Sequence, residues 1–90
     1  MVVELIKKLT IEKLRLLADA GGVREVHIVG QGTGFVLRIA TRDDEGTLET
    51  ALGEVRIFAK LDTAARTVHE LGLGRAVLDL TQWQPGQKGA

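Results

Sequence analysis

The chain of 90 residues lacks cysteine and tyrosine, and contains one proline, two phenylalanines and one tryptophan. Without cysteine, neither a disulfide framework nor a thiolate metal site can form. No apolar run approaches the roughly 20 residues of a membrane-spanning helix, so no membrane partner is expected. A signal peptide is not expected either, because Lys7 and Lys8 follow the first apolar residues instead of preceding them. These features predict a cytoplasmic protein.

The chain also lacks an excess of either charge, since 12 basic residues balance 12 acidic ones. Proteins that bind nucleic acid usually carry a basic excess, because the release of counterions from phosphates supplies much of their affinity. Nucleic acid is therefore a less favoured partner than protein. The apolar fraction of 44% is ordinary for a globular domain.

Apolar periodicity and capping residues predict two helices. The first follows Thr10, a suitable N-cap, and runs to about Ala20, where a glycine pair stops it. The second is expected to follow Asp62 as its N-cap and to end at Gly72, which can adopt a left-handed conformation. The expected apolar face of this second helix consists of Leu61, Ala64, Ala65, Val68 and Leu71.

Alternating apolar residues predict strands between and after these helices. The expected strands cover residues 23–29, 35–41, 47–52, 55–58 and 75–80, and a glycine-rich turn over residues 30–34 joins the first two.

The order α-β-β-β(β)-α-β predicts an α+β fold. We expect a single domain over residues 1–83, with a mainly antiparallel sheet and both helices packed on one of its faces. The last strand follows a helix, so it could pair parallel to an earlier strand. A disordered tail is expected over residues 84–90.

Three patterns resemble catalytic or ligand-binding motifs without meeting their requirements. The Gly30–Gly34 run precedes a strand, whereas a phosphate-binding loop precedes a helix. His27 and His69 lack the spacing of a metal site, and the acidic turn over residues 43–45 lacks that of a calcium loop. We therefore expect no catalytic activity, no cofactor, no metal ion and no small-molecule substrate.

The residues that most favour partner binding are Trp83, Arg38, Arg42 and Arg66. Trp83 follows the last expected strand, where it either packs at the edge of the core or anchors a partner, since large aromatic residues dominate interface hot spots. The arginines either form a solvated, salt-bridged surface or belong to a basic strip. That strip would consist of Arg24, Arg38, Arg42, Arg56, Lys60, Arg66 and Arg75.

Several segments together resemble the small ParC-type partition-associated proteins, which are unrelated to the topoisomerase subunit of that name. The segments that carry the resemblance are Leu17–Gly21, Val23–Val26, Val29–Gly32, Arg56–Phe58, Lys60–Arg66, Glu70–Gly72 and the terminal Trp83.

The resemblance implies an accessory role in the segregation or maintenance of plasmids and integrative conjugative elements. It implies action through protein contacts, and it supplies no catalytic residues. Two functional hypotheses follow. In the first, the chain is a non-enzymatic interaction module that binds another protein or a second copy of itself through a sheet edge or the Trp83 region. In the second, it binds nucleic acid weakly through its surface arginines.

Overall fold

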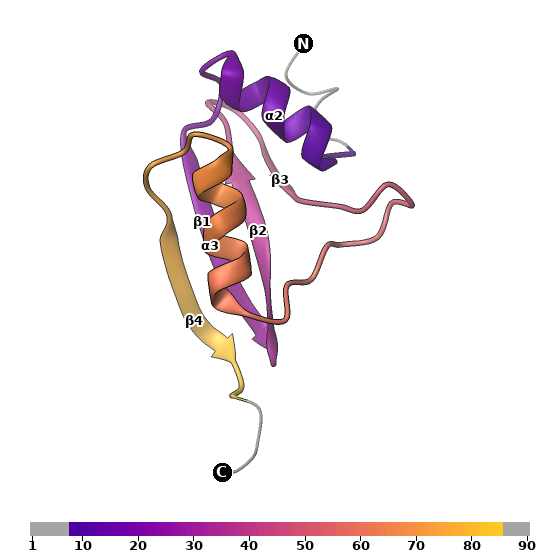
Figure 1. Cartoon of the computed structure of the whole chain (residues 1–90), viewed down its shortest axis with the longest axis vertical. Coiled ribbons are helices and arrows are strands. Elements are labelled where there is room, and N and C mark those ends of the chain that lie inside the picture. The colour runs from indigo at the N-terminus through magenta and orange to yellow at the C-terminus, as the bar shows by residue number, and fades with distance from the viewer. Residues whose placement is uncertain (1–7, 86–90) are drawn as a thin grey trace.

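A four-stranded sheet with the order β3-β2-β1-β4 forms one layer of the fold (Figure 1). The computed structural model describes residues 8–85. The strands are β1 (Glu25–Gly32), β2 (Gly34–Ala40), β3 (Glu45–Thr47) and β4 (Val77–Trp83). β2 pairs antiparallel with both β1 and β3, whereas β4 pairs parallel with β1. The predicted α+β class is confirmed, and so is the parallel pairing of the last strand.

Helices α2 (Ile11–Asp19) and α3 (Leu61–Glu70) pack on the same face of this sheet. Because side chains alternate along a strand, Val26 and Ile28 of β1 point toward the helices together with Ile39 and Leu37, their partners on β2. The other core residues are Leu9, Leu14, Leu17, Phe35, Leu48, Phe58, Ala64, Val68 and Leu71. Both helices therefore share one core, as predicted.

Helix α2 has the boundaries that its capping residues predict. The Thr10 hydroxyl accepts a hydrogen bond from the backbone N–H of Lys13 at 3.4 Å, which satisfies one free donor of the first turn. The chain leaves the helix through Ala20 and Gly21, and Gly21 has a φ of 73°. Leu14 and Leu17 are the fully buried residues of this helix.

Helix α3 begins earlier than predicted. Its N-cap is Lys60, which makes no side-chain capping bond, so the predicted N-cap role of Asp62 is wrong. Asp62 lies instead in the first turn, where a carboxylate is favoured by the positive end of the helix dipole. Leu61 and Ala65, predicted on the apolar face, are exposed.

The C-terminal end of α3 closes as predicted. Gly72 has a φ of 80°, and the N–H of Leu73 donates to the carbonyl of Val68 at 3.2 Å. This is the Schellman arrangement, in which a left-handed glycine lets the chain turn back over the last helical turn. The closure directs the chain toward β4.

Two strands extend further than predicted. β1 continues through Gly30 to Gly32, and β4 continues to Trp83, beyond the predicted end at Leu80. A register shift between β1 and β4 interrupts the apolar alternation of β4 near Leu80, which is why periodicity did not reveal its second half. Gln31 and Gly32, predicted in a turn, pair with Gln82 and Trp83.

The third strand is shorter than predicted. β3 ends at Thr47, and the predicted strands over residues 47–52 and 55–58 are replaced by an excursion over residues 48–58, called the arm below. The buried side chains of Leu48 and Phe58 anchor its two ends, and Phe58 pairs with Phe35 on β2. Between these anchors the arm projects from the sheet (Figure 1). Within residues 8–85, no further strand pairs with the arm to extend the sheet.

The predicted tail is only partly covered by the structure. Gln84 and Pro85 are exposed, and Gln84 donates a backbone hydrogen bond to Gly32. The remaining tail residues 86–90, like residues 1–7, lie outside the described part of the chain.

Gly30 is required because Trp83 occupies the space above it. A Cβ atom added to Gly30 would lie 2.4 Å from the Cβ of Trp83, closer than two carbon atoms can approach without movement. The tryptophan ring then reaches across β1 to Phe35, which is the β2 partner of Gly30. Glycine at this position thus allows the Trp83 side chain to cover the sheet over Gly30 and Phe35.

We predict that Gly30→Ala destabilises the fold by about 1–3 kcal/mol, because the added methyl group would push Trp83 and β4 away from β1. Gly74→Ala is the matched control, since a Cβ there meets no atom within 4 Å. Urea denaturation followed by circular dichroism would measure both changes. Equal stability of the two variants would contradict the proposed role of Gly30.

Candidate interaction surface

The outer edge of β4, opposite its pairing with β1, is called the β4 edge below. Within residues 8–85, β4 pairs with β1 alone and lies last in the sheet. An edge strand presents unpaired N–H and C=O groups that can pair with another strand. Proteins usually protect such edges with lysine, proline or inward charges, whereas the only charged residue of β4 is Asp79.

Three large apolar side chains of β4 are half exposed. Val77, Leu78 and Leu80 expose 47%, 43% and 44% of their surface. Leu78 lies beside Ile28 in the parallel register and therefore shares the face that α3 covers. Helix α3 contacts β1 and β2, however, and β4 lies to one side of it (Figure 1). Leu78 and Leu80 of β4 therefore lie outside the area that α3 covers.

Trp83 lies at the end of the same strand and packs inward. Its ring stacks on Phe35 with a centroid distance of 5.7 Å and an interplanar angle of 29°, and the side chain is half-buried against the core. The indole Nε1 is buried and has no hydrogen-bond partner among the described residues. Trp83 therefore holds β4 on the sheet.

We predict that Trp83→Ala lowers the free energy of unfolding by about 2–3 kcal/mol, because it removes the packing on Gly30 and Phe35. Trp83→Phe should cost only about 1 kcal/mol, since it keeps an aromatic ring and removes the unpaired indole N–H. Denaturation followed by circular dichroism would measure both. If Trp83→Ala unfolded at the wild-type urea concentration, the stacking would have no structural role.

The face of the sheet opposite the helices, called the open face below, carries paired charges. The His27 and Glu25 side chains lie 2.9 Å apart, and Arg38 forms an ion pair with Glu45 and donates to the Thr47 hydroxyl at 3.2 Å. Such exposed pairs contribute at most about 1 kcal/mol each. A shallow cleft of about 220 Å³ lies among them. On this face Glu45 thus pairs with the Arg38 guanidinium group, and Glu25 pairs with the His27 imidazole.

Asp79 also belongs to the open face, because it pairs with Val29 of β1. The backbone N–H of Thr81 donates to its Oδ1 at 2.9 Å. This bond and, after it, the hydroxyl of Thr81 lower the pKa of Asp79 below its ordinary value of 3.8. Desolvation opposes the shift, and the charge of His27 contributes the smallest lowering. The Asp79 carboxylate therefore stabilises the backbone of β4 at the register shift through a hydrogen bond within the strand.

The lowered pKa of Asp79 predicts a small contribution to the stability of the fold that is lost in acid. A lowered pKa in the folded state stabilises the fold above the unfolded value of 3.8, and this contribution disappears as the pH falls through the folded value. Asp79→Asn should therefore be less stable than the wild type at neutral pH and equally stable in acid. Urea denaturation of both proteins at several pH values would measure the difference. A constant difference at all pH values would contradict the assignment.

The candidate arginines lie on different surfaces. Arg38 is on the open face, whereas Arg66 is an exposed residue of α3, which covers the opposite face. Arg42 is exposed in the turn between β2 and β3. The structure thus brings Arg38 and Arg42 to neighbouring parts of the sheet and separates both from Arg66.

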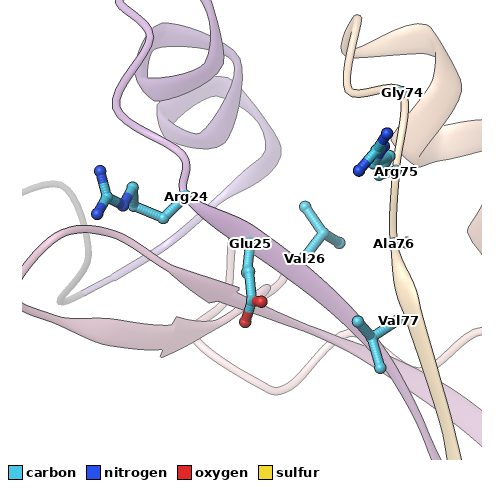
Figure 2. Close-up of a pocket in the computed structure, with 7 residues that line it drawn as sticks. All are labelled: Arg24, Glu25, Val26, Gly74, Arg75, Ala76 and Val77. Atoms are coloured by element: carbon cyan, nitrogen blue, oxygen red, sulfur yellow. The ribbon is translucent and has the colours of Figure 1, made fainter.

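A larger cleft of about 570 Å³ opens where the start of β4 diverges from β1. Its lining includes Arg24, Glu25, Arg75 and Val77. Figure 2 shows that the Arg24 side chain points away from Arg75, so the two guanidinium groups do not converge on a shared anion. The cleft exposes the backbone on which β4 begins.

A family model for ParC-like proteins matches residues 9–87. The chain belongs to the ParC-like family. The match spans α2, the whole sheet and α3. The resemblance predicted from the sequence is confirmed. No curated protein and no solved structure matches the chain.

Two further findings concern what this family member presents to its surroundings. Neither of the two helices in residues 8–85 has the length and apolar character needed to span a bilayer. Among the same residues, the arm carries the most exposed large apolar side chain, Leu52, at 89%.

Sequence reasoning did not identify Leu78 and Leu80 as a surface, because their alternation is typical of a core-facing strand. A signal was present in the chain. The sequence predicts a single helix in this half of the chain, and a helix about 10 Å wide spans only about two strands spaced about 4.8 Å apart.

Proposed function

We propose that this chain is a non-enzymatic accessory protein in the partition or maintenance of a plasmid or integrative element, and that it acts in the cytoplasm through protein–protein contacts at the β4 edge. Membership of the ParC-like family is compatible with a plasmid-related accessory role. The observation that carries the proposal is the apolar, unpaired edge formed by Val77, Leu78 and Leu80.

The chemistry of this edge favours a protein partner. Backbone N–H and C=O groups can add a strand from a partner, and apolar side chains beside them gain free energy when the partner covers them. Phosphates would be bound by arginine or lysine, and β4 contains neither. A peptide strand is therefore the ligand that suits this edge.

The arrangement of titratable groups supports a non-enzymatic role. His27 lies on the open face and His69 is exposed near the end of α3, so the two imidazoles belong to different surfaces. The acids nearest His27 are Glu25, which pairs with it, and Asp79, which bonds to Thr81. Each of these contacts lies within a single strand, β1 or β4.

We predict that the double substitution Leu78→Lys and Leu80→Lys reduces plasmid retention to the level of a gene deletion, because charges on the β4 edge oppose strand addition. The measurement is the fraction of cells that keep a plasmid carrying the gene and its natural neighbours after growth without selection. Leu16→Lys is the control, because Leu16 is 60% exposed on α2, away from this edge.

Circular dichroism must first establish that both variants are folded. Retention equal to wild type in the folded β4 variant would rule out the edge as the functional surface. The gene neighbourhood offers an independent check: a partition ATPase gene beside this one supports the proposal, and an unrelated metabolic operon argues against it.

A further inference from the structure

β4 carries large apolar side chains on both of its faces, although it is an edge strand. Strands that are buried on both faces are apolar on both, whereas edge strands usually carry charge. Leu78 lies on the face shared with α3, and Val77 lies beside His27 on the open face, yet each exposes more than two fifths of its surface. A further strand beside β4 would cover both.

The flank of α3 continues this apolar surface. A cleft of about 210 Å³ between α3 and the start of β4 is lined by Ile28, Ala65, Val68 and Leu73, among others. This cleft lies on the same face of the sheet as Leu78, because Leu78 lies beside Ile28. A strand that pairs with β4 would therefore place side chains at the opening of the cleft. The surface that a partner would cover therefore includes the β4 edge and the cleft beside it.

We infer that β4 pairs antiparallel with β4 of a second copy of this chain, about a two-fold axis near Leu78, so that two four-stranded sheets form one continuous sheet. This inference rests on the proposed function, because it names the partner of the β4 edge. A two-fold axis presents the same surface to itself and places equivalent strands antiparallel, which is the pairing that a C2 dimer allows.

The charges of β4 suit this register. With Leu78 opposite Leu78 of the second copy, Val77 lies opposite Asp79, and Ala76 lies opposite Leu80. Arg75 precedes β4, and continuing the same register past Val77 would place it diagonal to Asp79 of the second copy, within reach of an ion pair. A shift of one residue along each strand would place the two Asp79 carboxylates opposite each other, which is unfavourable.

Two other features agree with a second copy as the occupant. The net charge of the chain is zero, so two copies do not repel each other at neutral pH. The regular pairing of β4 with β1 covers Val77 to Asp79, before the register shift, so the part of the edge nearest the axis has regular strand geometry. The irregular part lies further away, where Asp79 holds Thr81.

Sedimentation velocity over a concentration series would test the dimer. We expect the wild type to approach twice the mass of 9.7 kDa as concentration rises, and the Leu78→Lys, Leu80→Lys variant to stay at the single-chain mass. Leu16→Lys should dimerise as the wild type does. A wild type that remains monomeric throughout overturns the inference.

A single-cysteine experiment would test the geometry, since the chain has no cysteine of its own. Across the two-fold axis, the Leu78→Cys side chains would lie close enough for a disulfide, and oxidation should yield a covalent dimer. Leu52→Cys, at the most exposed apolar position of the arm, is the control and should cross-link more slowly. Faster cross-linking of Leu52→Cys would overturn the inference, because the arm would then be the contact.

The two proposals can fail separately. A monomeric wild type, combined with poor plasmid retention of the β4 lysine variant, overturns the second copy as partner and supports contact with a different protein. A dimer that the lysines disrupt, combined with normal plasmid retention, supports the self-pairing and contradicts the proposed function.

Discussion

Helix α3 is about two strands wide, whereas the sheet on which it packs has four strands, and this mismatch determines where the core lies and where it stops. Helix α3 packs on β1 and β2, and α2 adds Leu14 and Leu17 to the same core. The two outer strands receive less cover. β3 is short and polar, so exposure costs it little, whereas β4 is longer and carries three half-exposed apolar side chains. The two edges differ because one helix spans only part of the width of the sheet.

Trp83 compensates for the missing helical cover at one end of β4. Its ring fills the space over Gly30 and stacks on Phe35, so three strands meet under one side chain. The contact requires glycine on β1, aromatic rings on β2 and β4, and a register shift that brings Trp83 beside Gly32. The beginning of β4 has no such residue, and its leucines are left half exposed.

Local signals predicted the parts of the fold that local chemistry determines. The Thr10 cap, the left-handed Gly72 and the alternation around Ile28 and Leu37 act within a few residues, so they can be read from sequence. The end of β4 and the arm depend on contacts between distant segments, and no local pattern encodes them. The same limit applies to the site: Trp83 was noticed because tryptophan is rare, whereas the exposure of Leu78 depends on where α3 lies in three dimensions.

The parallel pairing of β1 with β4 also orders the folding of the chain. His27 and Val77 are neighbours in the sheet, but β2, β3, the arm and α3 all lie between them in the sequence. Closing so long a loop costs conformational entropy, which the local β1–β2 hairpin does not incur to the same extent. β4 therefore docks after the hairpin and α3 have formed. Its outer edge comes into existence only on a nearly complete domain, so the chain cannot offer that edge to another strand before its own core has closed.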